Sequence, residues 1–214
     1  MPEPRLSESN KRRRTAQGEQ TYQAILQAAM NIASVEGLEG VSIGRLAREL
    51  NMSKSGLFAH FGSKEELQLA TIEAARAYVV KTVVRPALRT PKGLQRLQRL
   101  CEAWLNYTED NLFPGGCFFA MTAVEFKSRP GTVRDRLAAI MQERLQTFAR
   151  LIQDAQRSGE LAIELDRHQL AFEIDTLLMG ANWTFQLYGD PQVVTRTRQA
   201  IQERLQVAAA ERQL

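Results

Sequence analysis

Residues 52–67 read MSKSGLFAHFGSKEEL and contain two helix starts in close succession. Ser53 has the small polar side chain typical of an N-cap. Ser63 begins a stronger signal, because Ser63 and Glu66 fit the S-x-x-E capping box, in which each side chain satisfies a free backbone N–H group. Gly62 separates the two starts. The stretch therefore predicts a short helix that Gly62 ends and a longer helix that begins at Ser63.

Two further helices are expected before this stretch. Between residues 20 and 36 the apolar side chains recur at helical spacing, and glycines then break the chain. Ser42 can cap a second short helix, and Asn51 tolerates the left-handed backbone of a tight turn. Two short helices joined by a tight turn, the second with small polar residues at its start, are typical of a helix-turn-helix. In that motif the second helix enters the major groove of DNA.

The rest of the chain also reads as helices. One helix is expected over 63–84 and ends before Pro86, and the next runs from Thr90-Pro91 to about 105. The others are expected over 117–127, over 132–157, over 166–188 and in the segment after 191. No segment predicts a strand. The expected fold is therefore all-α with nine helices. It has a basic N-terminal arm (1–18), a three-helix helix-turn-helix domain (19–64), and a C-terminal helical bundle for ligand binding and dimerisation (65–214).

Charge is distributed unevenly along the 214 residues. The net charge is +4 and the isoelectric point is about 9.3, while 44% apolar residues suffice for a real core. Residues 1–64 hold nine Lys/Arg against six Asp/Glu, and four of those cations form the run 11–14, KRRR. A solvated tail and a flexible arm that reaches DNA both fit this run.

Few residues suit catalysis, metal binding or redox chemistry. The two cysteines, Cys101 and Cys117, form no CxxC pair, and the two histidines, His60 and His168, belong to no cluster with metal-ligand spacing. No catalytic residue, metal or cofactor is predicted, and an all-α enzyme is the weakest alternative. A redox sensor built on the two cysteines is the other alternative. No apolar stretch approaches the length of a membrane span, and a reduced, cytoplasmic setting is expected.

The segment from Ile25 to Leu67 resembles the DNA-binding domain of the TetR family of bacterial transcriptional regulators. Two departures stand out: Phe58 replaces the tyrosine that is usual in the family, and Leu50-Asn51 replaces the usual Ala-Gly of the turn. The positions that match the family pattern are Ala28, Ala29, Gly37, Ser42, Leu46, Ala47, Ser53, Leu57, His60, Phe61, Lys64 and Leu67.

The resemblance implies a set of DNA contacts. Residues 53–56 would face the groove, with Lys54 the best candidate for a guanine edge. His60 would contact phosphate, although packing at the end of its helix fits it equally well. Arg12, Arg13 and Arg14 join the set from the basic run and not from the resemblance. The full predicted set is Arg12, Arg13, Arg14, Ser42, Arg45, Ser53, Lys54, Ser55, Gly56, Phe58, His60 and Lys64.

For the C-terminal part, the resemblance implies a dimer and a small-molecule effector that changes the spacing of the two DNA-reading heads. The predicted protein is a dimeric repressor that binds a DNA operator, with an effector still unidentified. Ordinary burial is an open alternative for each residue below. Those expected in the pocket are Trp104, Phe118, Met121, Glu125, Phe148, Met179 and Trp183. Those expected in the dimer interface, on two helices of a four-helix bundle, are Leu170, Ile174, Leu178, Ile201 and Leu205.

Overall fold

A computed structural model describes the backbone of residues 8–210 and the side chains of residues 17–209, and within 8–210 it contains helices and no strand. In chain order the elements are α1 (Glu8–Glu36), the 3-10 turn η1 (Leu38–Gly40), α2 (Ile43–Glu49), α3 (Lys54–Phe58), α4 (Lys64–Val79), the π-helical segment η2 (Val80–Val84), α5 (Arg85–Leu88), α6 (Leu94–Glu109), α7 (Phe118–Phe126), α8 (Thr132–Arg157), α9 (Arg167–Tyr188) and α10 (Gln192–Ala210).

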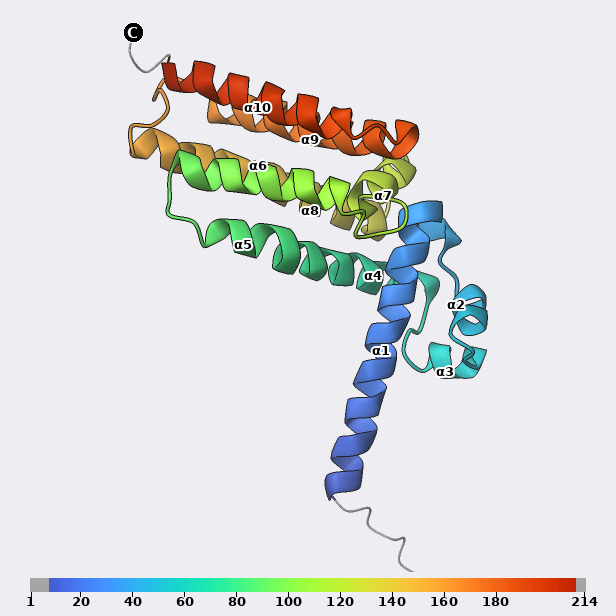
Figure 1. Cartoon of the computed structure of the whole chain (residues 1–214). Helices are drawn as coiled ribbons and strands as arrows, with labels where there is room; N and C mark the ends of the chain where they lie inside the picture. The colour runs from blue at the N-terminus through green and yellow to red at the C-terminus, as the bar shows by residue number, and fades with distance from the viewer. Residues whose placement is uncertain (1–7, 211–214) are drawn as a thin grey trace, which may run out of the picture.

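Figure 1 shows a small head joined to a larger layered bundle. In the head, α2 and α3 lie beside the long α1. In the bundle, α4 and α5 form one layer, α6 and α8 the next, and α9 and α10 the outermost. The two parts are packed together, because α1 contacts both α4 and α7. The head is therefore in direct contact with two helices of the bundle.

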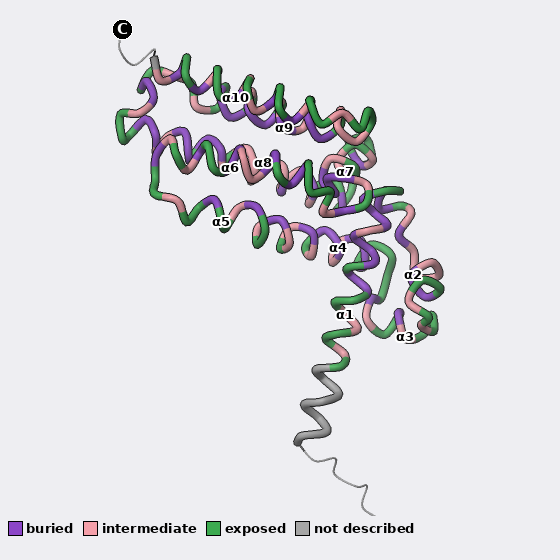
Figure 2. Tube along the Cα trace, in the orientation of Figure 1, coloured by how far each residue is buried: buried purple, intermediate pink, exposed green. Residues whose placement is uncertain are grey.

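Helical periodicity explains how the bundle encloses a core. In α8, for example, Val133, Leu137, Ile140, Phe148 and Ile152 are buried and lie on one face of the helix. Figure 2 shows buried residues along the inward sides of α4, α6, α8 and α9 and exposed residues on the outer sides. The buried residues form one contiguous cluster that runs from α1 to α10.

The expectation of nine helices is confirmed for the described residues, with α4, η2 and α5 counted as one unbroken stretch and the short turn η1 set aside. The start of the first helix was predicted wrongly. Its backbone is helical from Glu8, so residues 8–18 continue α1. The apolar pattern missed this segment because residues 8–18 carry no apolar face to mark it.

Pro86 does not lie beyond the end of the fourth helix, as expected, but inside it. The chain passes from α4 into the π-helical η2, and Pro86 then occupies the first turn of α5. Proline lacks an N–H donor, and the first turn of a helix is where that donor is least needed. The change of helical register at Val80–Val84 provides such a first turn without breaking the helix.

The capping predictions are partly confirmed. Ser63 accepts the Glu66 N–H at 3.1 Å as expected, but the Glu66 carboxylate accepts the N–H of Gly62, at 2.8 Å. The short helix α3 ends at Phe58, before Gly62. At α6 the expected Thr90-Pro91 start is wrong. The helix begins at Leu94.

The start of α6 depends on a residue far along the chain. The Leu94 N–H donates to the carboxylate of Glu160, at 2.9 Å. Gly93 precedes it with φ of 114°, and a Cβ there would lie 2.1 Å from a Glu160 oxygen. Glycine is required for both reasons, because it adopts this backbone and leaves room for the carboxylate. A remote side chain therefore supplies the cap, which no local motif indicates.

Candidate nucleic-acid interface and ligand pocket

The turn between α2 and α3 is built from local hydrogen bonds. Ser42 accepts the Arg45 N–H at 3.2 Å and caps α2, and Ser53 accepts the Gly56 N–H at 3.0 Å and caps α3. Asn51 adopts φ of 51°, the left-handed conformation expected of it. The Met52 N–H then donates to the Ala47 carbonyl at 2.8 Å. These contacts fix the direction in which α3 leaves α2.

A small apolar core sets which face of α3 points outward. Leu57 and Phe61 are buried, as expected. The Phe61 ring stacks on that of Tyr22 in α1, with ring centres 5.3 Å apart, and the His60 ring lies 6.1 Å from the same tyrosine. His60 is half-buried and therefore combines a packing role with a partly accessible ring. Phe58 does not join this core, because it is 54% exposed.

The predicted DNA-contacting residues are arranged around this outer face. Ser53, Lys54, Ser55 and Phe58 are exposed on or beside α3, Lys64 is exposed at the start of α4, and Ser42, Arg45, Gly56 and His60 are partly buried. The side chains of Arg12, Arg13 and Arg14 lie outside the described residues. The prediction omitted Arg48, which is exposed at the end of α2 and forms no ion pair among residues 17–209. The sequence could have indicated Arg48 as a DNA-contacting residue, because it follows Arg45 by three residues in the last turn of α2.

Two of these cations are held by acidic residues of the same head. Arg45 forms a two-pronged hydrogen bond with Glu36, and Lys64 donates to the carboxylate of Glu39 at 2.8 Å and to its carbonyl at 3.2 Å. The hydrogen bond from Arg45 lowers the pKa of Glu36, and that from Lys64 lowers the pKa of Glu39. Both carboxylates are therefore ionised near neutral pH and compete with any other anion for these cations.

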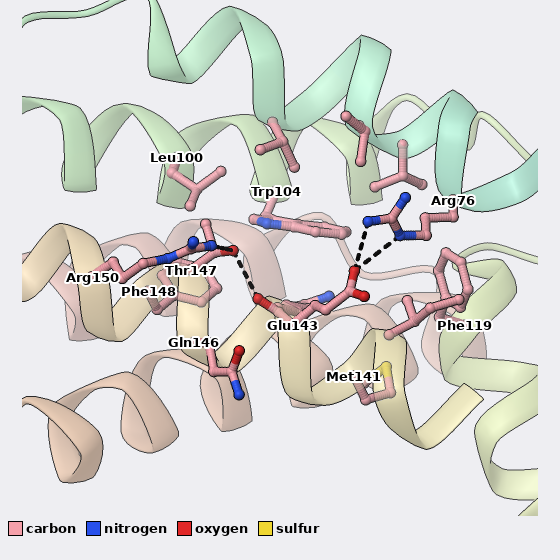
Figure 3. Close-up of a pocket in the computed structure, with 15 residues that line it drawn as sticks. Arg76, Leu100, Trp104, Phe119, Met141, Glu143, Gln146, Thr147, Phe148 and Arg150 are labelled. Carbon is pink, nitrogen blue, oxygen red and sulfur yellow. Dashed lines mark hydrogen bonds and ion pairs between the residues drawn. The ribbon is translucent and has the colours of Figure 1, made fainter. Parts of the chain in front are cut away.

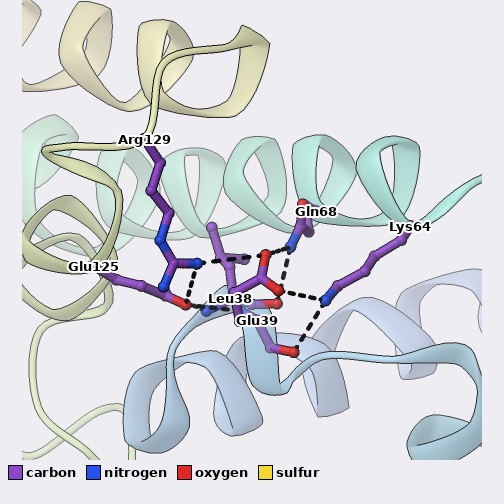
Figure 4. A network of polar contacts seen from close by, with 6 residues as sticks. All are labelled: Leu38, Glu39, Lys64, Gln68, Glu125 and Arg129. Carbon is purple, nitrogen blue, oxygen red and sulfur yellow. Dashed lines mark hydrogen bonds and ion pairs between the residues drawn. The ribbon is translucent and has the colours of Figure 1, made fainter.

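Glu125 joins the bundle to the head. Its carboxylate, at the end of α7, accepts the N–H groups of Leu38 at 2.7 Å and Glu39 at 3.0 Å, as Figure 4 shows. Gly37, with φ of 77°, makes room, because a Cβ there would lie 2.3 Å from a Glu125 oxygen. The expectation that Glu125 lines the pocket is therefore wrong. Its two oxygens already bind the head, and it instead fixes the position of η1.

Gln68 and Arg129 complete the contact between bundle and head. Gln68 of α4 donates to the Leu38 carbonyl at 3.1 Å, and the Arg129 guanidinium lies 3.8 Å from the Glu39 carboxylate (Figure 4). Together with Lys64, these residues connect α4 and the end of α7 to the same 3-10 turn. Since η1 directly precedes α2, these contacts tie α4 and the end of α7 to the start of the helix-turn-helix.

The bundle contains a cavity of about 350 Å³ between α4, η2, α6, α7 and α8. Its walls are mainly apolar, and Figure 3 shows the Trp104 ring across the middle. At one side Arg76 donates to the Glu143 carboxylate from Nε at 2.9 Å and from Nη2 at 2.7 Å. At the other, Arg150 donates to the Thr147 hydroxyl at 3.0 Å. The size and the apolar walls with a few polar groups are typical of small-molecule sites.

Only part of the predicted pocket set lines this cavity. Trp104 and Phe148 do so, whereas Phe118 is fully buried in the core beside it. Met121 and Trp183 are exposed on the outside of the molecule, and Met179 borders a separate small cavity. The sequence showed which helices carry aromatic and other large apolar side chains, but it did not show which face of each helix points into the cavity. The residues from α4 and α8 were missed because their charged neighbours resemble an ordinary solvent-exposed face.

Comparison with known families matches both parts of the chain. Residues 93–201 match the family described as "Tetracyclin repressor-like, C-terminal domain", and residues 25–71 match "Bacterial regulatory proteins, tetR family". The chain belongs to the TetR family. It is therefore a DNA-binding transcriptional regulator with a C-terminal ligand-binding domain.

Individual relatives agree with this assignment. The transcriptional regulator AcuR of Cereibacter sphaeroides is 23% identical over 154 residues, which cover 70% of this chain and 69% of AcuR. A TetR regulator from Chloroflexus aurantiacus has the same fold, with a TM-score of 0.80, 24% identity and coverage of 87% and 94% of the two chains. The structure of AibR with isovaleryl coenzyme A and operator DNA gives a TM-score of 0.66 at 18% identity, covering 83% and 95%.

The two cysteines of this TetR-family chain are both buried and unbonded. Burial raises the pKa of the Cys101 thiol to about 12, which keeps it protonated and unreactive at neutral pH. The family assignment gives no support to the redox or enzyme alternatives. Among the described residues, no helix is both long and apolar enough to cross a membrane.

The residues expected at the dimer interface lie inside the chain. All five are buried against neighbouring helices of the same bundle, so they cannot meet a second copy without unpacking the core; they are Leu170, Ile174, Leu178, Ile201 and Leu205. The outer face of α9 is apolar as well, with Phe172, Trp183 and Leu187 exposed. The sequence pattern could not separate these faces, because α9 is apolar on both.

Proposed function

We propose that this chain acts as a dimeric repressor in which a small molecule, bound in the cavity of about 350 Å³, weakens operator binding by moving α4. The observation that carries the proposal is the course of α4 itself. Gln68 near its start donates to the Leu38 carbonyl in the head, and its later residues Arg76 and Val79 line the cavity. A rigid helix that touches both places couples ligand binding to the head.

In the DNA-bound state, Lys54 and Ser55 face the major groove from the exposed start of α3. Arg45 and Lys64 exchange their carboxylate partners for backbone phosphates. The Lys64–Glu39 pair supports such an exchange, because the two side chains are 45% and 48% exposed. Exposed ion pairs contribute at most about 1 kcal/mol, so a phosphate competes with them readily.

The dimer forms through the outer face of α9. Its exposed residues recur at helical spacing and make a continuous stripe: Phe172, Thr176, Gly180, Trp183 and Leu187. Three of them are large and apolar, and a stripe of this kind on a monomer marks an interaction surface. Two copies paired through this stripe about a two-fold axis would bring α9 and α10 of each together as a four-helix bundle.

DNA binding is tested with the purified full-length protein and the promoter region of its own gene. We expect binding to a palindrome whose half-sites lie about 34 Å or a small multiple apart, with affinity that falls steeply as salt rises. Binding that is insensitive to salt, or no preference for any palindrome, would contradict the proposed repressor.

The dimer is tested separately by measuring the mass of the protein in solution. Trp183→Asp places a charge in the centre of the α9 stripe, and we expect a shift to monomer together with weaker operator binding. Val35→Asp is the matched control, because Val35 is also exposed but lies on α1. An unchanged dimer in Trp183→Asp would place the interface elsewhere.

A further inference from the structure

Two buried polar groups without a hydrogen-bond partner lie on one small cavity of the bundle. They are the Tyr107 hydroxyl, on α6, and the Asn182 Nδ2 amide, on α9. Both residues are more than nine-tenths buried, at 4% and 5% exposure. The cavity they share, of about 10 Å³, is also lined by Trp104, Cys117 and other residues. An unpaired buried polar group costs about 1–3 kcal/mol, so two on one cavity mark a place where a bound ligand or water molecule supplies the missing hydrogen bonds.

A third donor faces the same place. Arg144 of α8 lines both this small cavity and the larger one, and Trp104 does the same, so these two side chains form the wall between the cavities. The Arg144 guanidinium stacks on the Trp104 ring at 3.8 Å, and its Nε–H donates to Asp175. Its remaining N–H donors form no hydrogen bond within the part of the chain that the structure describes.

The charges around the two cavities favour a negative ligand. Asp175 is paired with Arg144, and Glu143 with Arg76, so each lining or adjoining acid is already neutralised. Arg150, at the mouth of the larger cavity, has no acidic partner among residues 17–209. A cationic ligand would find guanidinium groups and no free carboxylate, whereas an anion would find unpaired donors.

Burial, followed by the adjacent Cys117, raises the pKa of the Tyr107 hydroxyl, which therefore stays protonated and can donate. The Cys117 thiol is only a weak hydrogen-bond acceptor, so it leaves this donor available. With Arg144 and Asn182, the hydroxyl completes a group of donors that matches a carboxylate, which only accepts hydrogen bonds.

We propose that the effector is an amphipathic carboxylate. Its carboxylate receives hydrogen bonds from Arg144, Tyr107 and Asn182, and its apolar chain lies in the larger cavity against Leu100 and Phe148. This assignment rests on the proposed effector function of that cavity and specifies the class of ligand. The small cavity holds about one water-sized probe as it stands, so binding requires it to enlarge. Met179, a flexible and partly exposed side chain on its wall, allows this enlargement.

The test compares three ligands of equal chain length on the full-length protein by calorimetry: hexanoate, hexanamide and hexylamine, with butyrate and octanoate to probe the size of the apolar site. We expect the carboxylates to bind and hexylamine not to bind. Tyr107→Phe keeps the aromatic ring and removes only the hydroxyl, so it should fold normally, and it should bind hexanoate roughly tenfold more weakly. Tyr78→Phe, a change of the same kind on α4 outside both cavities, should bind hexanoate like the wild type.

Two results would overturn the carboxylate assignment. One is binding of hexylamine or hexanamide without binding of any carboxylate. The other is unchanged hexanoate affinity in Tyr107→Phe. Operator binding is measured in parallel and separates this inference from the proposed function. If hexylamine or hexanamide releases the operator, the effector-controlled repressor stands and only the assignment fails. If the protein without ligand does not bind operator DNA, the repressor proposal fails while calorimetry still decides the ligand class.

Discussion

The DNA-binding head and the effector bundle both place arginine and lysine next to carboxylates, but in opposite environments. Where α4 meets the head, Lys64 and Glu39 are about half exposed, whereas inside the bundle the Arg144 and Asp175 side chains are only 10% and 12% exposed. An exposed pair contributes little and exchanges partners easily. A buried pair is costly to break, because the remaining charge is left without solvent or partner. The Lys64–Glu39 pair is therefore suited to partner exchange, and the Arg144–Asp175 pair to fixed geometry.

The largest expected effect comes from breaking the buried pair. Asp175→Ala leaves the Arg144 guanidinium unpaired in the interior, and we expect a loss of about 3–5 kcal/mol in the free energy of unfolding. Chemical denaturation measures this change. Asp135→Ala, which removes the partner of Arg134 on an exposed part of α8, is the control and should change stability little. Equal losses in the two variants would remove the distinction between buried and exposed pairs.

Lys54 is a cation of the head that is free to bind DNA. Lys54 is exposed at the start of α3 and forms no ion pair among the described residues. Lys54→Ala should weaken operator binding roughly tenfold and reduce the salt dependence, because one contact with the DNA is lost. Fluorescence anisotropy at several salt concentrations provides the measurement. Lys92→Ala, in the connection between α5 and α6 at the end of the molecule away from α3, should bind like the wild type (Figure 1).

A smaller and opposite effect is expected from releasing Lys64. Glu39→Gln removes the carboxylate that holds it, so operator affinity should rise about threefold if Lys64 then binds phosphate. Glu65→Gln is the matched control, since it removes the same charge from the head without freeing Lys64. A similar rise in both variants would attribute the gain to net charge and not to partner exchange.

The smallest effect is expected at Phe58, where the family pattern has tyrosine. Because the Phe58 side chain is 54% exposed, it is not part of the packed core of the head. Phe58→Tyr adds a hydroxyl that can reach a phosphate, and we expect about a twofold to threefold gain in operator affinity with unchanged stability. Unchanged affinity would show that this side chain points away from the DNA backbone.

Head and bundle also differ in how much of their structure could be predicted from the sequence. In the head, Ser42, Asn51, Ser53 and Ser63 have the caps and turn conformation that were predicted, because each acts on backbone groups within a few residues. The DNA-contacting set drawn from the family pattern remains a prediction. In the bundle, most of the predicted pocket and dimer residues were misplaced, because their roles depend on contacts between distant helices.

Sequence alone determined the all-α class, the order of the helices and the helix-turn-helix, since caps and apolar spacing are local signals. Tertiary structure decided what covers each apolar face. On α9, Ile174 faces the core, while Trp183 on the same helix faces outward. Tertiary structure also brought Glu125 to η1 and Glu160 to α6, across 87 and 66 residues of chain. Periodicity shows that a face is apolar, and only packing determines what lies against it.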